Sequence, residues 1–193
     1  MNYLTLLNID GGNSMFLIDK VLYLHDRIGY SRKQGVRIGQ NCSIMGNSFP
    51  FGTEPYLVTI GDHVRINDGV RFFTHDGSVW VLRGLAGEEG FPKNLNNIDL
   101  FGKITVGNNV QIGSNALILP NVSIGNNVII GAGAIVTRSV PDNSVAVGIP
   151  ARVISSIGDF YKKHRAEFMH TKNMDPSSKK DFVLKNIDKL DGE

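Results

Sequence analysis

His75 is the residue of this chain whose type and position best suit catalysis. It lies in the run 73–77, FTHDG, just before a long glycine-containing segment. Val70 and Phe72 precede it at alternating positions, so if these two face a core, His75 points outward. Imidazole has an unperturbed pKa of about 6.5 and can accept the proton of an alcohol, which is otherwise a poor nucleophile at neutral pH. The position predicts a general base on an outer wall, beside a loop that could close over a reacting group.

An acid that orients His75 is harder to assign from the sequence. Asp76 is adjacent, but successive side chains of an extended chain point to opposite faces. We therefore expect the orienting carboxylate to come from a loop or from a neighbouring subunit, with Glu88, Glu89 and Asp10 as candidates ahead of Asp76.

A six-residue repeat must position this histidine. Apolar residues recur every six positions in two registers offset by two, and every slot of both registers is filled. The slots are Val106, Ile112, Ile118, Ile124, Ile130 and Val136 in one register, and Ile104, Val110, Ala116, Val122, Val128, Ala134 and Val140 in the other. A fixed period of this kind indicates a repeat architecture with one continuous core.

The residues that follow the first register show a longer period of three hexads, in which two glycines are followed by a larger residue. Three hexads therefore make one turn of a triangular coil, whose neighbouring turns stack as parallel strands about 4.8 Å apart. Glycine and asparagine fit the corners because they tolerate a left-handed backbone. The sequence predicts an all-β solenoid.

The repeat extends upstream with two interruptions. Ile60, Ile66 and Phe72 continue the first register, and a rougher turn begins at Ile38. The first interruption, at 50–55, adds four residues to a turn. The second, 78–103, contains no hexad and is expected to be a loop that protrudes from the solenoid.

Composition and charge agree with one such domain and short flanks. We expect an N-terminal flank at 1–35, the solenoid at 36–154 with its loop insertion at 78–103, and a C-terminal helical tail at 155–193 that begins with an amphipathic helix over 155–170. The net charge of +2 gives no indication of nucleic-acid binding. The apolar stretch 15–24 is too short for a membrane span and no signal peptide is visible, so a cytoplasmic location is the default.

The C-terminal half of the repeat resembles a known family, the hexapeptide-repeat acyltransferases. Three runs carry the resemblance: IGSNA at 112–116, IGAGAIVTRSVP at 130–141 and GIPARVI at 148–154. The family fold is a left-handed parallel β-helix, so the left hand is implied by the resemblance. Periodicity alone does not give it, because parallel crossovers generally favour the right hand.

Further runs resemble the branch of the family that acetylates sugars and cell-surface polysaccharides. They are EPYLVTIG at 54–61, FTHDG at 73–77 and VWVLR at 79–83. The resemblance implies an acetyltransferase that moves an acetyl group from acetyl-CoA to a hydroxyl or amino group of a saccharide by direct transfer, with His75 as the base. It also implies a homotrimer with the active sites between subunits.

The resemblance further implies a set of coenzyme contacts. Ser114 and Ala132, one turn apart, would line the pantetheine arm, and Thr137 lies one face further on. Arg138 and Arg152 would bind the coenzyme phosphates, with ordinary surface charge as the alternative.

Acceptor contacts are less specific. Trp80, Arg83 and Glu88 are weak candidates, and packing within the loop explains Trp80 and Arg83 equally well. The chain departs from many relatives at Gln111, where tryptophan is common, and at Ile149, where asparagine is common. Both departures touch the expected coenzyme groove.

Three alternative functions are less well supported. Some β-helix trimers bind zinc through three histidines, but His63 and His75 are two hexads apart and fall on different faces, so no metal is expected. A non-catalytic scaffold would need neither the His75 motif nor the arginine pair. A xenobiotic enzyme that acetylates an antibiotic hydroxyl is the second choice within the family.

Overall fold

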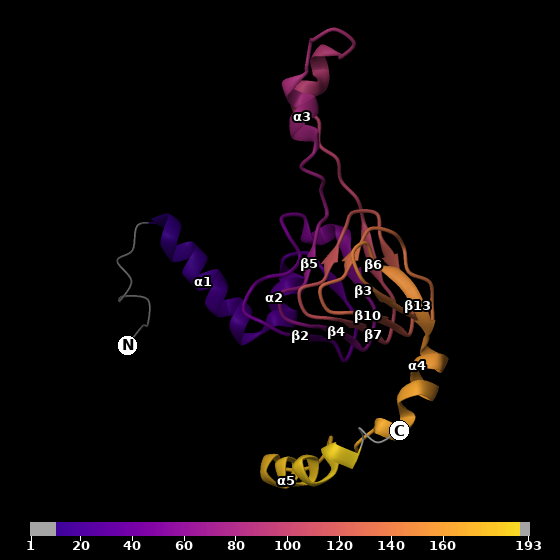
Figure 1. Cartoon of the computed structure of the whole chain (residues 1–193). Coiled ribbons are helices and arrows are strands. Elements are labelled where there is room, and N and C mark those ends of the chain that lie inside the picture. The colour runs from indigo at the N-terminus through magenta and orange to yellow at the C-terminus, as the bar shows by residue number, and fades with distance from the viewer. Residues whose placement is uncertain (1–10, 190–193) are drawn as a thin grey trace, which may run out of the picture.

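The computed structural model describes residues 11–189 of the chain. Its strands form three sheets that share one core (Figure 1). Sheet A contains β1 (Arg37–Ile38), β3 (Val58–Ile60), β6 (Ile104–Val106) and β9 (Ser123–Ile124). Sheet B contains β2 (Ser43–Ile44), β4 (Val64–Ile66), β7 (Val110–Ile112), β10 (Val128–Ile130), β12 (Ser144–Val147) and β13 (Arg152–Ser156). Sheet C contains β5 (Arg71–Phe72), β8 (Leu117–Ile118) and β11 (Ile135–Val136).

Strands that are neighbours in a sheet come from successive turns of the chain. β6 and β9 pair in parallel with Thr105 opposite Ser123, exactly three hexads further on. β1 and β3 pair Arg37 with Thr59 across the short interruption, and β3 and β6 pair Thr59 with Thr105 across the long one. The parallel stacking predicted from the repeat is confirmed, and both interruptions lie between strands that stay in register.

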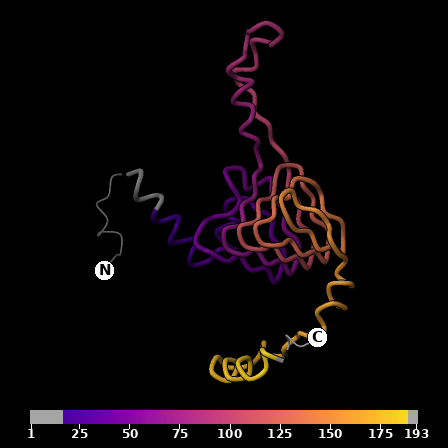
Figure 2. Tube along the Cα trace, viewed as in Figure 1, coloured from indigo at the N-terminus to yellow at the C-terminus, as the bar shows by residue number. Residues whose placement is uncertain are grey.

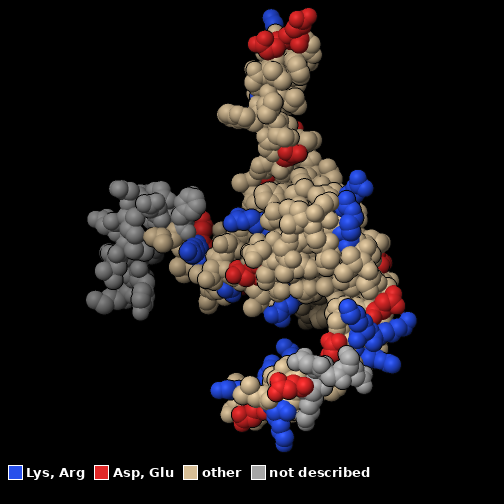
Figure 3. Space-filling view, viewed as in Figure 1, with Lys and Arg blue, Asp and Glu red and all other residues tan. Residues whose placement is uncertain are grey.

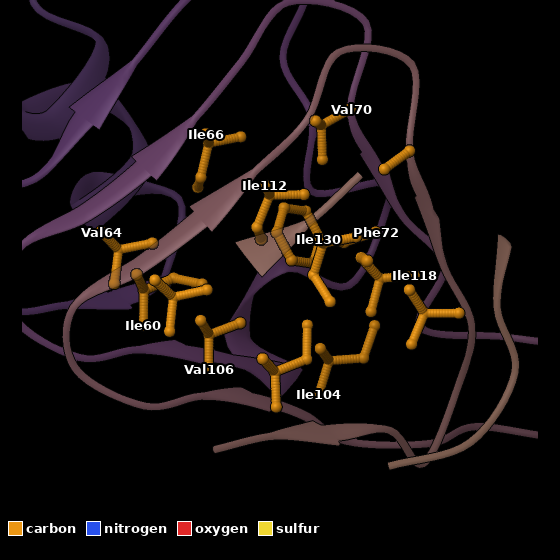
Figure 4. Packing of buried hydrophobic residues seen from close by; sticks show 14 of the residues in the cluster. Ile60, Val64, Ile66, Val70, Phe72, Ile104, Val106, Ile112, Ile118 and Ile130 are labelled. Carbon is orange, nitrogen blue, oxygen red and sulfur yellow. The ribbon is translucent and has the colours of Figure 1, made fainter. Parts of the chain in front are cut away.

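The apolar repeat positions form the core. All thirteen slots of the two registers are at most 6% exposed. Figure 4 shows several of these side chains, among them Ile112, Ile118 and Ile130, pointing inward from the strands. Each buried aliphatic side chain contributes about 1.5–3 kcal/mol relative to an exposed one, so the interior of the coil is the main source of its stability.

The corners between the sheets hold asparagines and glycines, as the sequence predicts. Asn109 and Asn127 adopt φ values of 55° and 54°. At the same corner the side-chain oxygen of Asn126 accepts a 2.8 Å hydrogen bond from the backbone N–H of Asn108 in the preceding turn. These bonds satisfy corner N–H groups that no strand partner reaches.

Gly113 marks the closest approach between two turns at the corner between sheets B and C. A Cβ atom on Gly113 would lie 2.4 Å from the backbone nitrogen of Ala132. No other residue type fits there without moving the next turn.

The long interruption forms an arm that projects from the coil (Figures 1 and 2). It contains the short helix α3 (Val79–Gly84) and the 3₁₀ turn η3 (Lys93–Asn97), so the predicted loop carries local structure. At its base the two limbs run antiparallel, with Asp76 N–H donating to Leu100 O and Gly102 N–H donating to Thr74 O, both at 2.8 Å. The base of the arm is therefore fixed to the coil. The short interruption is compact and ends in the 3₁₀ turn η2 (Pro55–Leu57).

Two helices, α1 (Gly11–His25) and α2 (Arg27–Lys33), precede the first turn within the expected N-terminal flank. Tyr23 is 2% exposed and packs edge-on against Tyr30 and Phe49. Together with Phe51, these rings cover the open end of the core. Among the helices within 11–189, none is both long and apolar enough to cross a membrane.

The C-terminal end of the coil differs from the sequence expectation. β13 pairs antiparallel with β12 and runs through Ser156, across the boundary expected at 154. The helix predicted over 155–170 is α4 (Ile157–His164), followed by the 3₁₀ turn η4 (Arg165–Glu167). It begins at 157 because the Ser156 hydroxyl accepts a hydrogen bond from the Asp159 N–H. α5 (Pro176–Asn186) and the 3₁₀ turn η5 (Ile187–Lys189) complete the described chain.

Candidate functional site

His75 lies on the outside of the coil at the base of the arm. It follows β5, whose Phe72 is buried, and its side chain is 49% exposed. His75 also forms an isolated antiparallel bridge with Phe101 on the returning limb, and the two rings meet edge-on with centroids 6.4 Å apart. The outward orientation expected from strand alternation is what the structure has.

Glu54 is the partner of this imidazole. Its Oε2 lies 2.9 Å from His75 Nδ1 and also accepts a 2.8 Å hydrogen bond from the Thr74 hydroxyl. Its Oε1 accepts a 2.8 Å bond from the Thr53 hydroxyl. A carboxylate only accepts hydrogen bonds, so Nδ1 carries a proton and Nε2 of the neutral ring is left to accept one.

The surroundings of Glu54 keep it ionised. Burial raises the pKa of this carboxyl, but the hydrogen bonds from His75, Thr53 and Thr74 outweigh burial and hold the pKa below its ordinary value. Because the folded-state pKa is lowered, ionised Glu54 contributes stability above its ordinary pKa, and that contribution is lost as the pH falls through the folded value. Near neutral pH the ionised Glu54 carboxylate therefore accepts the hydrogen bond from Nδ1 of His75.

Among the described residues of this chain, none of the acids expected from the sequence contacts His75; Glu54 does. Glu88 and Glu89 follow α3 at the far end of the arm, where Figure 3 shows acidic side chains well away from the coil. Asp10 lies outside the described residues. Asp76 accepts a 2.9 Å hydrogen bond from the Ser78 N–H, which is the main reason that its pKa is lowered. It shapes the turn into the arm and does not contact the imidazole.

The sequence contains a signal that could have identified Glu54. In the regular turns, two residues that pair between neighbouring strands are three hexads apart in the sequence. The interruption at 50–55 makes this separation longer between β2 and β4, where Ser43 pairs with Arg65. The same longer separation counted back from His75 leads to Thr53, the neighbour of Glu54. The insertion therefore brings the acid alongside His75 in the preceding turn.

A small cavity of about 170 Å³ adjoins the imidazole, and its lining includes Gly52, Thr53, Phe73 and His75. A larger groove of about 440 Å³ lies on the outer face of sheet B near His63. His63 is an exposed corner residue with φ of 54°, and its Nδ1 lies 2.8 Å from Asn109 Oδ1. His63 therefore lies on a different wall from His75, as the spacing of the two residues in the sequence predicts.

The residues proposed to contact an acceptor are all on the arm. Trp80 is 76% exposed on α3. Arg83 binds the backbone oxygen of Ile98 and the carboxylate of Asp99, so its guanidinium connects the two limbs of the arm. Glu88 follows α3 toward the tip. None of these side chains contacts His75 directly, and the packing explanation accounts for Arg83.

The residues proposed for the coenzyme fall on adjoining corners of the coil. Ser114 and Ala132 occupy the same corner in successive turns, beside the close approach at Gly113, and Ser114 O accepts a 2.8 Å bond from the N–H of Gly133. Thr137 is exposed directly after β11.

Two exposed arginines accompany these corners. Arg138 follows β11, and Arg152 begins β13 with one guanidinium N–H bonded to the backbone oxygen of Ala151. Neither forms an ion pair with any residue in the described part of the chain. Uncompensated guanidinium groups of this kind fit phosphate oxygens.

Comparisons with known proteins identify the family of the repeat. Residues 103–138 match the family model described as bacterial transferase hexapeptide (six repeats). Protein CapG of Staphylococcus aureus is 47% identical over 154 residues, which cover 79% of this chain and 84% of that protein. Galactoside O-acetyltransferase of Escherichia coli K12 is 35% identical over 144 residues, which cover 72% of this chain and 64% of that enzyme.

The fold also matches solved structures. The hexapeptide-repeat-containing acetyltransferase VCA0836 of Vibrio cholerae, solved in complex with acetyl coenzyme A, superposes with a TM-score of 0.51 at 21% identity, covering 75% of this chain and 84% of that one. Because the identity is low, this likeness supports the fold alone.

Proposed function

The chain belongs to the hexapeptide-repeat acetyltransferases, and we propose that it transfers the acetyl group of acetyl-CoA to a hydroxyl group of a sugar or a cell-surface polysaccharide precursor, with His75 as general base. The observation that carries the proposal is the 2.9 Å contact between His75 and Glu54 at the base of the arm. This contact leaves an unprotonated, outward nitrogen where an acceptor can reach it.

Acetyl-CoA supplies an activated thioester, so the protein has only to activate and position the acceptor. Nε2 of His75 takes the proton of the acceptor hydroxyl as its oxygen attacks the thioester carbonyl carbon. The negative charge of Glu54 stabilises the imidazolium that forms. When the carbon–sulfur bond breaks, His75 returns the proton to the leaving sulfur. The acetyl group passes directly to the acceptor oxygen and no residue of the chain is acylated.

Backbone N–H groups are proposed to hold the oxyanion of this reaction. Preorganised donors of this kind contribute roughly 3–4 kcal/mol, and a general base contributes about 100- to 10,000-fold in rate. Together these effects are adequate for a thioester. The left hand of the coil and a homotrimer with sites between subunits follow from the family and are proposed for this chain on that basis.

Glu54 is proposed to act as a positioning residue through His75. Glu54→Gln should lower kcat about 10- to 1,000-fold, with the KM values for acetyl-CoA and for the acceptor near those of the parent. A neutral amide does not stabilise the imidazolium, and it does not require the proton of the neutral ring to be on Nδ1. Steady-state kinetics and thermal melting test this. Glu89→Gln, at the tip of the arm, is the matched control and should behave as the parent. An unchanged kcat in Glu54→Gln would remove Glu54 from the mechanism.

Arg138 and Arg152 are proposed to bind the coenzyme phosphates, with Ser114, Ala132 and Thr137 along the arm of the coenzyme. Arg138→Gln should raise the KM for acetyl-CoA about tenfold with kcat nearly unchanged, because a charge-assisted hydrogen bond to a distant phosphate contributes to binding and not to the chemical step. Arg37→Gln in the first turn serves as a control. Equal KM values for Arg138→Gln and the parent would count against the assignment.

A further inference from the structure

Arg71 lies on the coil next to the proposed site, and none of the roles proposed above is assigned to it. It lies on β5, four residues before His75, and is exposed while Phe72 between them is buried. Arg71, Phe73 and His75 therefore project from the same side of the chain. Within residues 17–188, whose side chains the structure describes, the Arg71 guanidinium makes no hydrogen bond or ion pair. An unpaired guanidinium on the wall that carries the base is available to a ligand.

Two cavities meet at this arginine. Arg71 lines the cavity of about 170 Å³ that contains His75, and it also lines a second cavity of about 470 Å³ between α1 and the first turn. The second cavity is lined further by Lys20, Tyr30 and Asn47. The two cavities share Arg71 as a lining residue, one on the side of His75 and the other on the side of the N-terminal helices.

The charged residues that line the second cavity are two cations and one carboxylate. Lys20 and Arg71 face a single carboxylate in the second cavity, that of Asp19. Tyr30 also lines this cavity, and its pKa is raised by burial first and by the nearby Asp19 second. Lys20, like Arg71, has no ion-pair partner in the described part of the chain. The cavity thus retains uncompensated positive charge.

We infer that the acceptor is an anionic saccharide, whose carboxylate or phosphate binds Arg71 with Lys20 nearby while a hydroxyl lies at His75. The inference rests on the proposed function and specifies its substrate class. Four residues of extended chain place the Cα atoms of Arg71 and His75 about 13 Å apart, a span that one or two sugar rings with their substituents can bridge. Guanidinium binds carboxylate and phosphate in a paired geometry. Phe73, 40% exposed between them, offers an apolar surface to a sugar ring.

The test compares neutral and anionic acceptors in parallel. Methyl hexosides, the corresponding uronic acids and the corresponding sugar 1-phosphates are assayed as acceptors with saturating acetyl-CoA. We expect kcat/KM at least about tenfold higher for the uronic acids or for the sugar phosphates than for the neutral sugars, and which of the two is preferred identifies the anion.

Arg71→Gln should lower kcat/KM for the preferred anionic acceptor about 10- to 100-fold, and it should leave kcat/KM for neutral acceptors and the KM for acetyl-CoA unchanged. Arg37→Gln, an outward arginine on sheet A, is the control and should match the parent.

The outcomes separate this inference from the proposed function. If the parent acetylates neutral sugars as well as anionic ones, or if Arg71→Gln affects both alike, the anionic acceptor is refuted while acetyl transfer stands. A raised KM for acetyl-CoA in Arg71→Gln would assign the arginine to the coenzyme and also refute the inference. If no acceptor of any class is acetylated, the proposed function fails together with it.

Discussion

Replacing His75 by alanine is expected to lower kcat about 100- to 10,000-fold while leaving the folded protein intact. The imidazole is the only group at the base of the arm that we propose to accept the acceptor proton, and a general base accounts for rate factors of this size. Its side chain is 49% exposed, so its removal takes away little buried surface. Acetyl transfer is measured by the release of free coenzyme thiol, with acetyl-CoA and the best acceptor both saturating.

Thermal melting of the same variant separates catalysis from folding. A midpoint close to that of the parent is expected, because Glu54 keeps its hydrogen bonds from Thr74 and Thr53 when the imidazole is gone. Binding of acetyl-CoA should also persist, since no coenzyme contact is assigned to His75. Full activity in His75→Ala would refute the base assignment, whatever the stability of the variant.

Replacing Ile124 by aspartate is expected to prevent folding. Ile124 on β9 is 2% exposed inside the coil, where it pairs with Val106 in the turn before and bridges to Val140 in the turn after. An unpaired carboxylate at this position loses its hydration and gains no partner, which costs several kcal/mol, a large part of the total stability of a domain. The circular dichroism spectrum and the yield of soluble protein report the result.

The neighbouring residue supplies the control for this substitution. Ser123 precedes Ile124 on the same strand and is exposed on the outer face of sheet A. Ser123→Asp introduces the same charge one position away and should fold as the parent does. A soluble and active Ile124→Asp protein would contradict the burial of this position, whereas failure of both variants would mean that β9 tolerates no charge at all.

The regular turns could be predicted from the sequence because each slot of the repeat is dictated by a local rule. An inward position such as Ile118 must be apolar, and a corner such as Asn115, with φ of 60°, must tolerate a left-handed backbone. The outward position of His75 follows from the same alternation. These features depend only on neighbours in sequence and on the period.

The features that the sequence did not predict depend on contacts between turns of unequal length. Glu54 contacts His75 because the earlier turn is longer than a regular one, and a search for acids near His75 in sequence passes over it. β13 was missed because its antiparallel pairing with β12 ends the six-residue pattern and leaves Val153 and Ile154 exposed. Neither feature carries a periodic signal of its own.

The way in which the arm joins the coil bears on how such a protein can change over evolution. β3 and β6 pair in register although the whole arm lies between them in the chain, so the extra residues leave the spacing of the walls intact. Since each turn contacts only the turns beside it, the length and composition of the arm can vary without disturbing the rest of the molecule. Such a protein can acquire a new ligand specificity through insertions, deletions or substitutions in the arm, while the histidine at its base and the coil that carries it stay the same.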